Sequence, residues 1–232
     1  MPVVLSQRNT QIEEKMDSPD CDPRMLANTY RQFKTINKLL TGWTGIYKKW
    51  IRPVVASQNG KASLLDIGSG GGDILHFLSQ LTRRDGFNVQ FTGIDPDPRA
   101  TGFARNNFSA TNLNFYKKTS IDLVKKGERF DIVISNHLIH HLSEPGLVNL
   151  CGEASKLANR LVLFSDIERS DTGYASFRIL APLLFSNSFI VEDGLTSIRR
   201  SYTKNELKRH LPENWDVKKK FPFRLIAIHR KT

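Results

Sequence analysis

The stretch Ser63-Leu-Leu-Asp-Ile-Gly-Ser-Gly-Gly-Gly-Asp73, followed at 91–95 by Phe-Thr-Gly-Ile-Asp, decides the fold. The apolar run 64–67 is typical of a buried parallel strand, and the glycine-rich residues 68–72 are typical of a tight turn. Apolar residues then recur at helical spacing from Ile74 to Leu81, which predicts a helix directly after the turn. Strand, glycine turn, helix and a second strand that ends in an acid together predict a βαβ unit that binds a nucleoside.

The glycine turn also indicates which kind of nucleoside binds. Glycine lets a ligand approach the main chain, because it has no Cβ and tolerates positive φ. The turn departs from the G-x-G-x-x-G pattern of dinucleotide sites, and it lacks the Gly-Lys-Ser/Thr ending of a phosphate-binding loop. Asp73 would repel a pyrophosphate at the start of the helix. We therefore expect a nucleoside without phosphates, compatible with a positive charge, whose ribose hydroxyls bond the carboxylate of Asp95.

These residues resemble motif I of the class I S-adenosylmethionine-dependent methyltransferases, and Asp95 is similar to that family's ribose-binding acid. The resemblance covers residues 60–165 and includes a fourth strand over 130–135. It implies an α/β, Rossmann-like fold: a seven-stranded, mostly parallel sheet with helices on both faces, N-terminal helices and a helical insertion after strand five. It also implies S-adenosylmethionine as the cofactor and S-adenosylhomocysteine as the product. The residues it places against the cofactor are Asp66, Gly68, Ser69, Gly70, Asp73, Asp95, Pro96, Thr119, Ser120, Asn136 and His137.

One of these residues departs from the family pattern. Thr119 stands where the family often carries an acid that bonds the adenine amino group. A hydroxyl can still accept that bond, and the backbone of Ser120 could make the contact instead. Asp122 is a less well placed candidate.

The chain divides by composition into three parts. Residues 1–20 are polar and aperiodic, and we expect them to be disordered. Residues 21–58 predict a helical extension, with one helix over 24–40 and another from about 44 to 51, which in this family packs over the cofactor or forms a lid. Residues 59–232 then form the methyltransferase domain.

The C-terminal part of that domain carries its own signals. The apolar, helical segment within 166–200 is expected to build the substrate pocket, with a turn at 193–194. Thr203 and Glu206 have the spacing of a capping box, which predicts a helix start. Two final strands, over 215–220 and 224–229, are expected to form an antiparallel hairpin at the sheet edge.

Bulk composition limits the function classes. The chain has 232 residues, two cysteines and a formal net charge of +11, and no apolar run approaches the length of a membrane span. We expect no disulfide framework and a cytoplasmic location. The basic residues occur as scattered pairs, which favours a solvated surface over a nucleic-acid interface, although RNA is not excluded.

The candidates for acid–base chemistry follow the fourth strand. His137, His140 and His141 lie there, and His140 is the predicted general base, since histidine titrates near neutral pH. The i, i+3, i+4 spacing is also used by metal sites, but the acids that would complete one are absent nearby, so no metal is predicted. Asp166 could orient an acceptor hydroxyl, but pairing with Arg169 is the favoured role.

From Asp22 to Glu206 the chain also resembles a narrower bacterial group, the type-11-like methyltransferases often found beside type III polyketide synthases. This resemblance rests on Asp22-Pro-x-x-Leu, Asp166-x-x-Arg169 and the run 193–207. It implies a small acceptor and O-methylation of a phenolic, polyketide or quinone-like hydroxyl. The alternatives are an RNA or protein methyltransferase, motivated by the net charge, and a non-catalytic protein that binds S-adenosylmethionine. The oligomeric state is left open.

Overall fold

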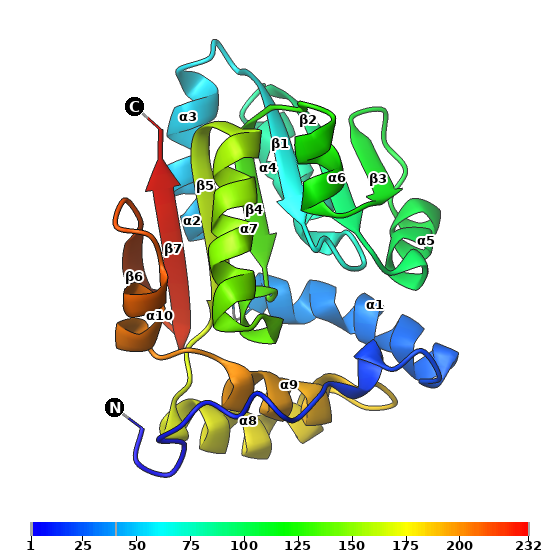
Figure 1. The fold of residues 1–232 in the computed structure, drawn as a ribbon. Coiled ribbons are helices and arrows are strands. Elements are labelled where there is room, and N and C mark those ends of the chain that lie inside the picture. Colours follow the sequence, from blue (N-terminus) through cyan, green and yellow to red (C-terminus); the bar gives the residue numbers. More distant parts are fainter. Residues whose placement is uncertain (1, 40, 232) are drawn as a thin grey trace.

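The computed structural model describes residues 2–39 and 41–231, and within them seven strands form one sheet in the order β3-β2-β1-β4-β5-β7-β6 (Figure 1). Strand β7 pairs antiparallel with both of its neighbours, while the pairs among β1 to β5 are parallel. The predicted fold class, including the terminal hairpin, is therefore confirmed. The strands are β1 (Lys61–Ile67), β2 (Asn88–Asp95), β3 (Leu113–Lys117), β4 (Phe130–Asn136), β5 (Ala158–Ile167), β6 (Asp216–Lys220) and β7 (Arg224–Arg230).

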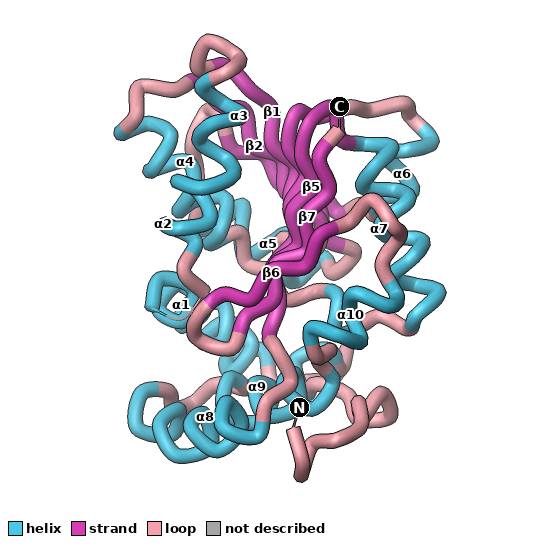
Figure 2. Tube along the Cα trace, turned by 90° about the vertical axis from the view of Figure 1, so that its left-hand side faces the viewer, coloured by secondary structure: helices cyan, strands magenta, loops and turns pink. Residues whose placement is uncertain are grey.

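Helices cover both faces of the sheet (Figure 2). Two large apolar clusters, one on each face, hold them there, and the central strands contribute fully buried residues to both. Because the strands are buried on both faces, they carry the nearly continuous apolar runs seen in the sequence. One face carries α2 (Trp43–Ile46), the π-helix η2 (Tyr47–Ile51), α3 (Arg52–Ala56), α4 (Asp73–Arg84) and α5 (Pro98–Asn107). The other carries α6 (Ser120–Lys125), α7 (Glu144–Leu157) and α10 (Lys204–His210).

A third layer lies across the carboxyl ends of the parallel strands (Figure 1). It consists of α1 (Pro23–Leu39), α8 (Asp171–Leu184) and α9 (Ile190–Arg200), which pack through a small cluster that includes Ile36, Ala181 and Ile190. Leu40, the last residue of the predicted first helix, lies outside the described residues. No helix in the described part of the chain is both long and apolar enough to span a membrane.

Residues 2–22, here called the N-terminal strap, differ from the expected disordered segment. The strap runs along α9 and α8 (Figure 1) and contains a short 3-10 helix, η1 (Lys15–Asp17). Arg8 donates to the carbonyls of His140 and Leu142, and Asp193 accepts hydrogen bonds from two strap amides. Polar contacts to distant parts of the chain order this segment, and such contacts leave no periodic pattern in its own sequence.

The prediction of a turn at 193–194 is wrong. Both residues lie inside α9, where the carboxylate of Asp193 accepts hydrogen bonds from the backbone of Lys15 and Met16. A Cβ on Gly194 would come within 2.4 Å of the Phe177 ring on α8. The glycine therefore serves the close packing of two helices and does not mark a chain reversal.

Candidate active site

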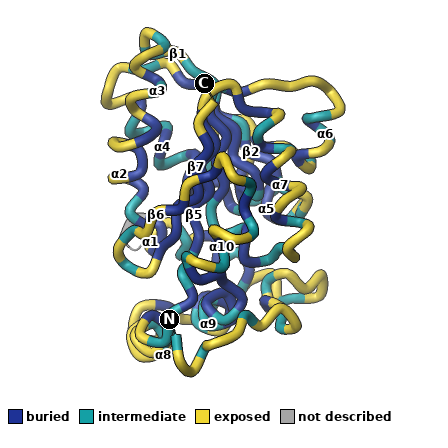
Figure 3. Tube along the Cα trace, turned by 60° about the vertical axis from the view of Figure 1, so that its left-hand side comes forward, coloured by how far each residue is buried: buried dark blue, intermediate teal, exposed yellow. Residues whose placement is uncertain are grey.

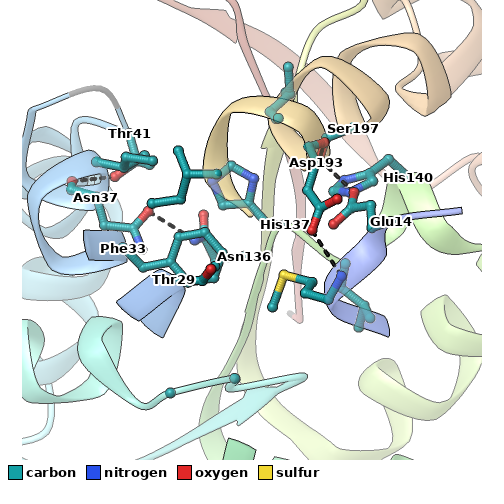
Figure 4. A pocket seen from close by; sticks show the side chains of 18 of the residues that line it. Glu14, Thr29, Phe33, Asn37, Thr41, Asn136, His137, His140, Asp193 and Ser197 are labelled. Atoms are coloured by element: carbon teal, nitrogen blue, oxygen red, sulfur yellow. Dashed lines mark hydrogen bonds and ion pairs between the residues drawn. The ribbon is translucent and has the colours of Figure 1, made fainter. Parts of the chain in front are cut away.

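A cavity of about 620 Å³ lies between the carboxyl ends of the strands and the layer of α1, α8 and α9. Parallel strands end at the same edge of a sheet, so the residues that follow β1, β2, β4 and β5 meet there. The glycine turn lines one part of this cavity. His140 lines another part, together with Glu14 and Ser197 (Figure 4). Of the predicted cofactor residues, those from β1, β2 and β4 and the turn after β1 are thus brought together in one place.

The glycine turn adopts a conformation that favours glycine. Gly68, Gly70 and Gly72 have φ values of +70°, +50° and +83°, in the left-handed region. No atom lies within 4 Å of the place a Cβ on Gly70 would occupy, so the backbone is open to a ligand there. Asp95 closes the turn from β2, since its Oδ2 accepts a hydrogen bond from the Gly70 amide at 2.9 Å. Pro96 lines the cavity next to it.

Two buried polar atoms in this part of the cavity have no hydrogen-bond partner in the described chain. They are Oδ1 of Asp66 and Oγ of Ser69. Burial, together with the charges of Asp73 and Asp95, raises the pKa of Asp66 well above its usual value. An unsatisfied buried polar group costs about 1–3 kcal/mol, so both atoms favour a ligand that carries polar groups. The three acids also favour a ligand that is positively charged.

A network of amides and one guanidinium connects the glycine turn to the end of β4. Asp73 accepts a hydrogen bond from the Asn37 amide at 2.8 Å, and burial raises the pKa of Asp73 to about 6. Asn136 donates to Asn37 and accepts from Arg224 and from the Trp43 indole. Asn136, Asn37 and Asp73 all line the cavity, and a contact between Asn136 and the cofactor stays a prediction.

His137 is held as a neutral imidazole. Its backbone has a φ of +57°, and its Nε2 lies 2.8 Å from Nη1 of Arg224. Burial, assisted by the charge of Arg224, places the pKa of His137 well below its usual value. Because a guanidinium only donates hydrogen bonds, Nε2 is the acceptor and the ring proton sits on Nδ1. His137 can therefore offer a hydrogen bond in this cavity but is a poor proton acceptor.

Thr119 and Ser120 differ from the prediction, since neither is among the residues that line the cavity. The backbone amide and hydroxyl of Thr119 both donate to Asp122, which completes a capping box at the start of α6. The hydroxyl of Ser120 donates to Glu153 at 2.5 Å. The Thr119 and Asp122 side chains thus cap the start of α6, a helix that the sequence had not indicated.

The predicted base His140 lies at a second, polar end of the cavity. Its Nδ1 is 2.8 Å from Oδ1 of Asp166. Its Nε2 is 3.1 Å from Oε1 of Glu14, and Figure 4 shows these two side chains next to each other. Burial by itself would lower the pKa of His140, but the two carboxylates outweigh it and raise that pKa to about 9. In this arrangement the ring is an imidazolium between two acids, whose pKa values it holds below their usual range against the effect of burial.

The sequence missed the contribution of the N-terminal strap to this end of the cavity. Glu14 is 6% exposed, and its Oε1 also accepts a hydrogen bond from Ser197 on α9 at 2.5 Å. Met16 and Asp17 line the cavity beside it, and Asp17 lies 3.2 Å from Nδ1 of His141. Glu14 is 126 residues away from His140 along the chain, so no local pattern could have paired them.

Arg169 does not pair with Asp166, which corrects the favoured role of that acid. Its guanidinium bonds Glu206 at 2.5 Å and donates to backbone carbonyls of the strap, including that of Leu5. Asp166 instead accepts from both the amide and the ring of His140. The second acid of the site is therefore one that the sequence had assigned to a structural ion pair.

Two groups of side chains place possible metal-binding atoms within 4.8 Å of one another. They are Glu14, His140 and His141, and His137, His140 and Asp166. His140 belongs to both groups, and both of its ring nitrogens already face carboxylates. These hydrogen bonds account for the closeness of the atoms, and the absence of a metal stays a prediction.

The stability of the folded chain is expected to fall as the pH rises toward 9. Folding raises the pKa of His140 from 6.5 to about 9, so folding favours the protonated ring. This contribution, about 3 kcal/mol, is fully present below about pH 6.5 and is lost as the pH rises through about 9. Urea unfolding across this window measures it. The variant His140→Gln, which has no ring to titrate, should show a flatter profile, and parallel profiles would contradict the assignment.

The comparisons with known proteins agree with this geometry. A family model described as a methyltransferase domain matches residues 64–160, which include the glycine turn, Asp95 and β4. The chain therefore carries a methyltransferase domain of the class I type over these residues. Within this family, a ubiquinone biosynthesis O-methyltransferase of Cereibacter sphaeroides is 33% identical over 115 residues, which are 48% of this chain and 44% of the relative. A release factor glutamine methyltransferase of Pasteurella multocida is 27% identical over 168 residues, 66% of this chain and 54% of the relative.

The chain thus spans about half the length of the curated relatives it matches. Solved structures of methyltransferases share the fold over more of the chain. A plantazolicin methyltransferase in complex with a pentazolic desmethylPZN analog and SAH aligns with a TM-score of 0.62 and 16% identity, over 90% of this chain and 96% of that one. Magnesium protoporphyrin IX methyltransferase from Synechocystis with bound SAH aligns with a TM-score of 0.56 and 14% identity, over 91% and 100%.

Proposed function

We propose that this chain transfers a methyl group from S-adenosylmethionine to a hydroxyl of a small phenolic, polyketide or quinone-like acceptor. One observation carries the proposal. His140, whose Nδ1 is held by the buried Asp166 behind it, lines the same cavity as the open glycine turn and Asp95. A site that joins a nucleoside-binding turn to a proton acceptor suits transfer to an oxygen that must lose its proton.

The cofactor end of the cavity fits S-adenosylmethionine in shape and charge. Asp95 would accept hydrogen bonds from the ribose hydroxyls, and the open backbone at Gly70 would admit the nucleoside. The free oxygen of Asp66 and the carboxylate of Asp73 suit the positively charged amino-acid portion. When bound, this cofactor supplies a methyl group on a positively charged sulfur, which keeps the electrons of its C–S bond when the acceptor oxygen takes the methyl.

His140 would receive the acceptor's proton on Nε2 while Asp166 holds Nδ1. With Glu14 in contact the pKa of His140 is about 9, so the ring is an imidazolium near neutral pH and must lose its Nε2 proton before it can act as a base. In the structure described here Glu14 occupies the Nε2 position, at 3.1 Å. Glu14 would take the Nε2 proton as it leaves this position, and the acceptor hydroxyl would take its place, so that a neutral imidazole nitrogen faces the hydroxyl.

The relatives give weight to two acceptor classes. Several are ubiquinone biosynthesis O-methyltransferases, which favours an aromatic hydroxyl, and one is a release factor glutamine methyltransferase, which favours a protein side-chain amide. The cavity carries many apolar side chains and lies beneath the strap and three helices. A concave, largely apolar cavity beneath these elements suits a small aromatic molecule better than a protein loop or RNA.

A panel assay tests the proposal. The chain is incubated with labelled S-adenosylmethionine and, separately, with phenols, catechols, hydroquinones, a matched set of anilines and thiols, bulk RNA and a glutamine-containing peptide. We expect label in the hydroxylated aromatics and equimolar S-adenosylhomocysteine. Transfer confined to RNA or to the peptide would contradict the acceptor class, and a cofactor bound without any transfer would favour a non-catalytic role.

A further inference from the structure

Arg224 is a buried cation that forms no ion pair within the described part of the chain. It lies at the start of β7, a strand that is buried along most of its length (Figure 3), and the residue is 3% exposed. Its guanidinium donates to the neutral groups of His137, Asn136 and Ser165, although several acids line the same cavity. A buried arginine is usually paired with an acid, because an unpaired charge is costly to desolvate. This departure indicates that Arg224 serves the cavity, which it also lines.

His137 adopts a backbone conformation that residues other than glycine rarely take. Its φ of +57° lies in the left-handed region, and residues held there cluster at functional sites. Strand β4 ends one residue earlier, at Asn136, so His137 begins the turn at the carboxyl end of that strand. The unusual backbone thus places this imidazole among the residues that line the cavity.

The two ring nitrogens of His137 have different surroundings. Nε2 accepts a hydrogen bond from Nη1 of Arg224 at 2.8 Å, so the ring proton is on Nδ1. Nδ1 has no hydrogen-bond partner among the residues that the structure describes. Hydrogen bonds in a chain polarise one another, and here a cation donates to the far side of the ring, so Nδ1–H is a strengthened donor. The site therefore holds a free and polarised N–H group.

His137 lies beside the proposed base. The rings of His137 and His140 meet edge to face with their centroids 6.3 Å apart, and Figure 4 shows both at the cavity. One oxygen can form hydrogen bonds with two nitrogens up to about 6 Å apart, since each bond is about 2.9 Å long. The other charged groups that face His137 are Asp166 from β5 and His141 from the 3-10 helix η3 (Ile139–His141). A molecule bound with its hydroxyl at His140 therefore has the His137 ring as a neighbour.

We infer that His137 donates its Nδ1 hydrogen to the acceptor oxygen and stabilises that oxygen in its ionised form, with Arg224 as the positioning residue that fixes the tautomer of His137. The inference rests on the proposed function, which supplies the hydroxyl. A donor aimed at an oxygen that gains negative charge favours its ionisation. The hydroxyl proton passes to Nε2 of His140, and the oxygen keeps the electron pair with which it takes the methyl group. His137 is thereby assigned to the acceptor, whereas the sequence placed it against the cofactor.

The test follows the ionisation of a bound phenol and requires no turnover. 4-Nitrophenol absorbs differently as phenol and as phenolate, so a pH titration of its complex with the chain saturated with S-adenosylhomocysteine measures the ionisation constant of the bound phenol. We expect that constant to be about tenfold or more above the value for free 4-nitrophenol. An unchanged constant in the wild type would overturn the inference and leave the proposed function standing. Failure to bind S-adenosylhomocysteine or 4-nitrophenol would remove both.

Variants separate the effect of His137 from that of the base. In His140→Gln no imidazole base is left at that position, so any increase in the ionisation constant that survives belongs to His137. Adding His137→Gly should return the constant to that of the free phenol, and glycine is chosen because it adopts positive φ readily. Equal constants in the single and the double variant would contradict the inference. His141→Gln is the control, since its ring also lines the cavity but faces Asp17 and Glu14, and it should leave the constant unchanged.

Two further measurements examine the cofactor and Arg224. The affinity of His137→Gly for S-adenosylhomocysteine should stay within about threefold of the wild type, and a loss of about tenfold or more would place the Nδ1 hydrogen on the cofactor and overturn the inference. Arg224→Gln should lose most of the increase in the ionisation constant, whereas Arg224→Lys, which keeps a charged donor, should retain more of it. Equal constants in these two variants would remove the positioning role of Arg224.

Discussion

Replacing Asp95 with alanine is expected to weaken binding of S-adenosylhomocysteine by about 100-fold or more. A carboxylate that accepts two hydrogen bonds from ribose hydroxyls contributes about 1.5–3 kcal/mol for each. The same side chain also holds the turn, because it accepts from the amides of Gly70 and Asp97 at 2.9 Å. Isothermal titration of the wild type and the variant measures the loss.

Two further variants separate the ligand contact from the support of the turn. Asp95→Asn keeps one acceptor oxygen and the shape of the side chain, so it should lose only part of the affinity. Asp131→Ala is the matched control, since Asp131 also accepts a backbone hydrogen bond, from Ser63, but does not line the cavity. If Asp95→Ala bound S-adenosylhomocysteine with the affinity of the wild type, Asp95 would not be a cofactor-binding residue.

Replacing His140 with glutamine is expected to lower kcat by about 10²- to 10⁴-fold, the usual contribution of a general base. The affinity for S-adenosylhomocysteine should stay within about threefold, because the glycine turn and Asp95 are untouched. Steady-state kinetics with the best acceptor of the panel measures the first quantity, and titration measures the second. The dependence of kcat on pH that His140 causes should disappear in the variant.

The variant must be shown to be folded, because it leaves two buried carboxylates without their cation. Removing one partner of a buried ion pair costs about 3–5 kcal/mol, so circular dichroism under the assay conditions is required. His141→Gln is the matched control, since His141 is the adjacent residue and 24% of its side chain is exposed. A kcat unchanged in His140→Gln, or lowered equally in His141→Gln, would contradict the assignment of the base.

The sequence predicted those parts of the site in which the functional residue lies inside or directly after a strand or turn that can be recognised from its own residues. The glycine turn must take left-handed backbone conformations, and glycine is the residue that permits them at Gly68 and Gly70. Asp95 ends a strand whose apolar residues mark its position, so its place at the cavity follows from strand order. His140 follows β4 in the same way.

The rest of the site depends on contacts between distant segments. Glu14 comes from a segment without periodicity, and only the folded chain brings it to His140. Asp166 could pair with Arg169 or with His140. The sequence favoured Arg169, which is nearer along the chain, whereas the structure pairs Asp166 with His140. Thr119 could act either as a ligand contact or as a helix cap, and its sequence neighbour Asp122 decided for the cap. For Glu14 and Asp166 the tertiary geometry determines the partner, whereas for Thr119 a contact three residues away in the sequence does.

The N-terminal strap is attached in a way that lets it open locally without unfolding of the sheet, so access to the cavity and stability of the fold can change independently. Among residues 2–20, Glu14 is the one that the structure buries. The strap is held largely by hydrogen bonds that Arg8 and Arg169 donate and by those that Asp193 accepts from strap amides. Local opening of such a segment costs far less than unfolding a sheet whose central strands are buried on both faces. Substitutions in the strap can therefore change the free energy of local opening at the cavity, and its dependence on salt. The free energy of unfolding of the sheet should stay the same.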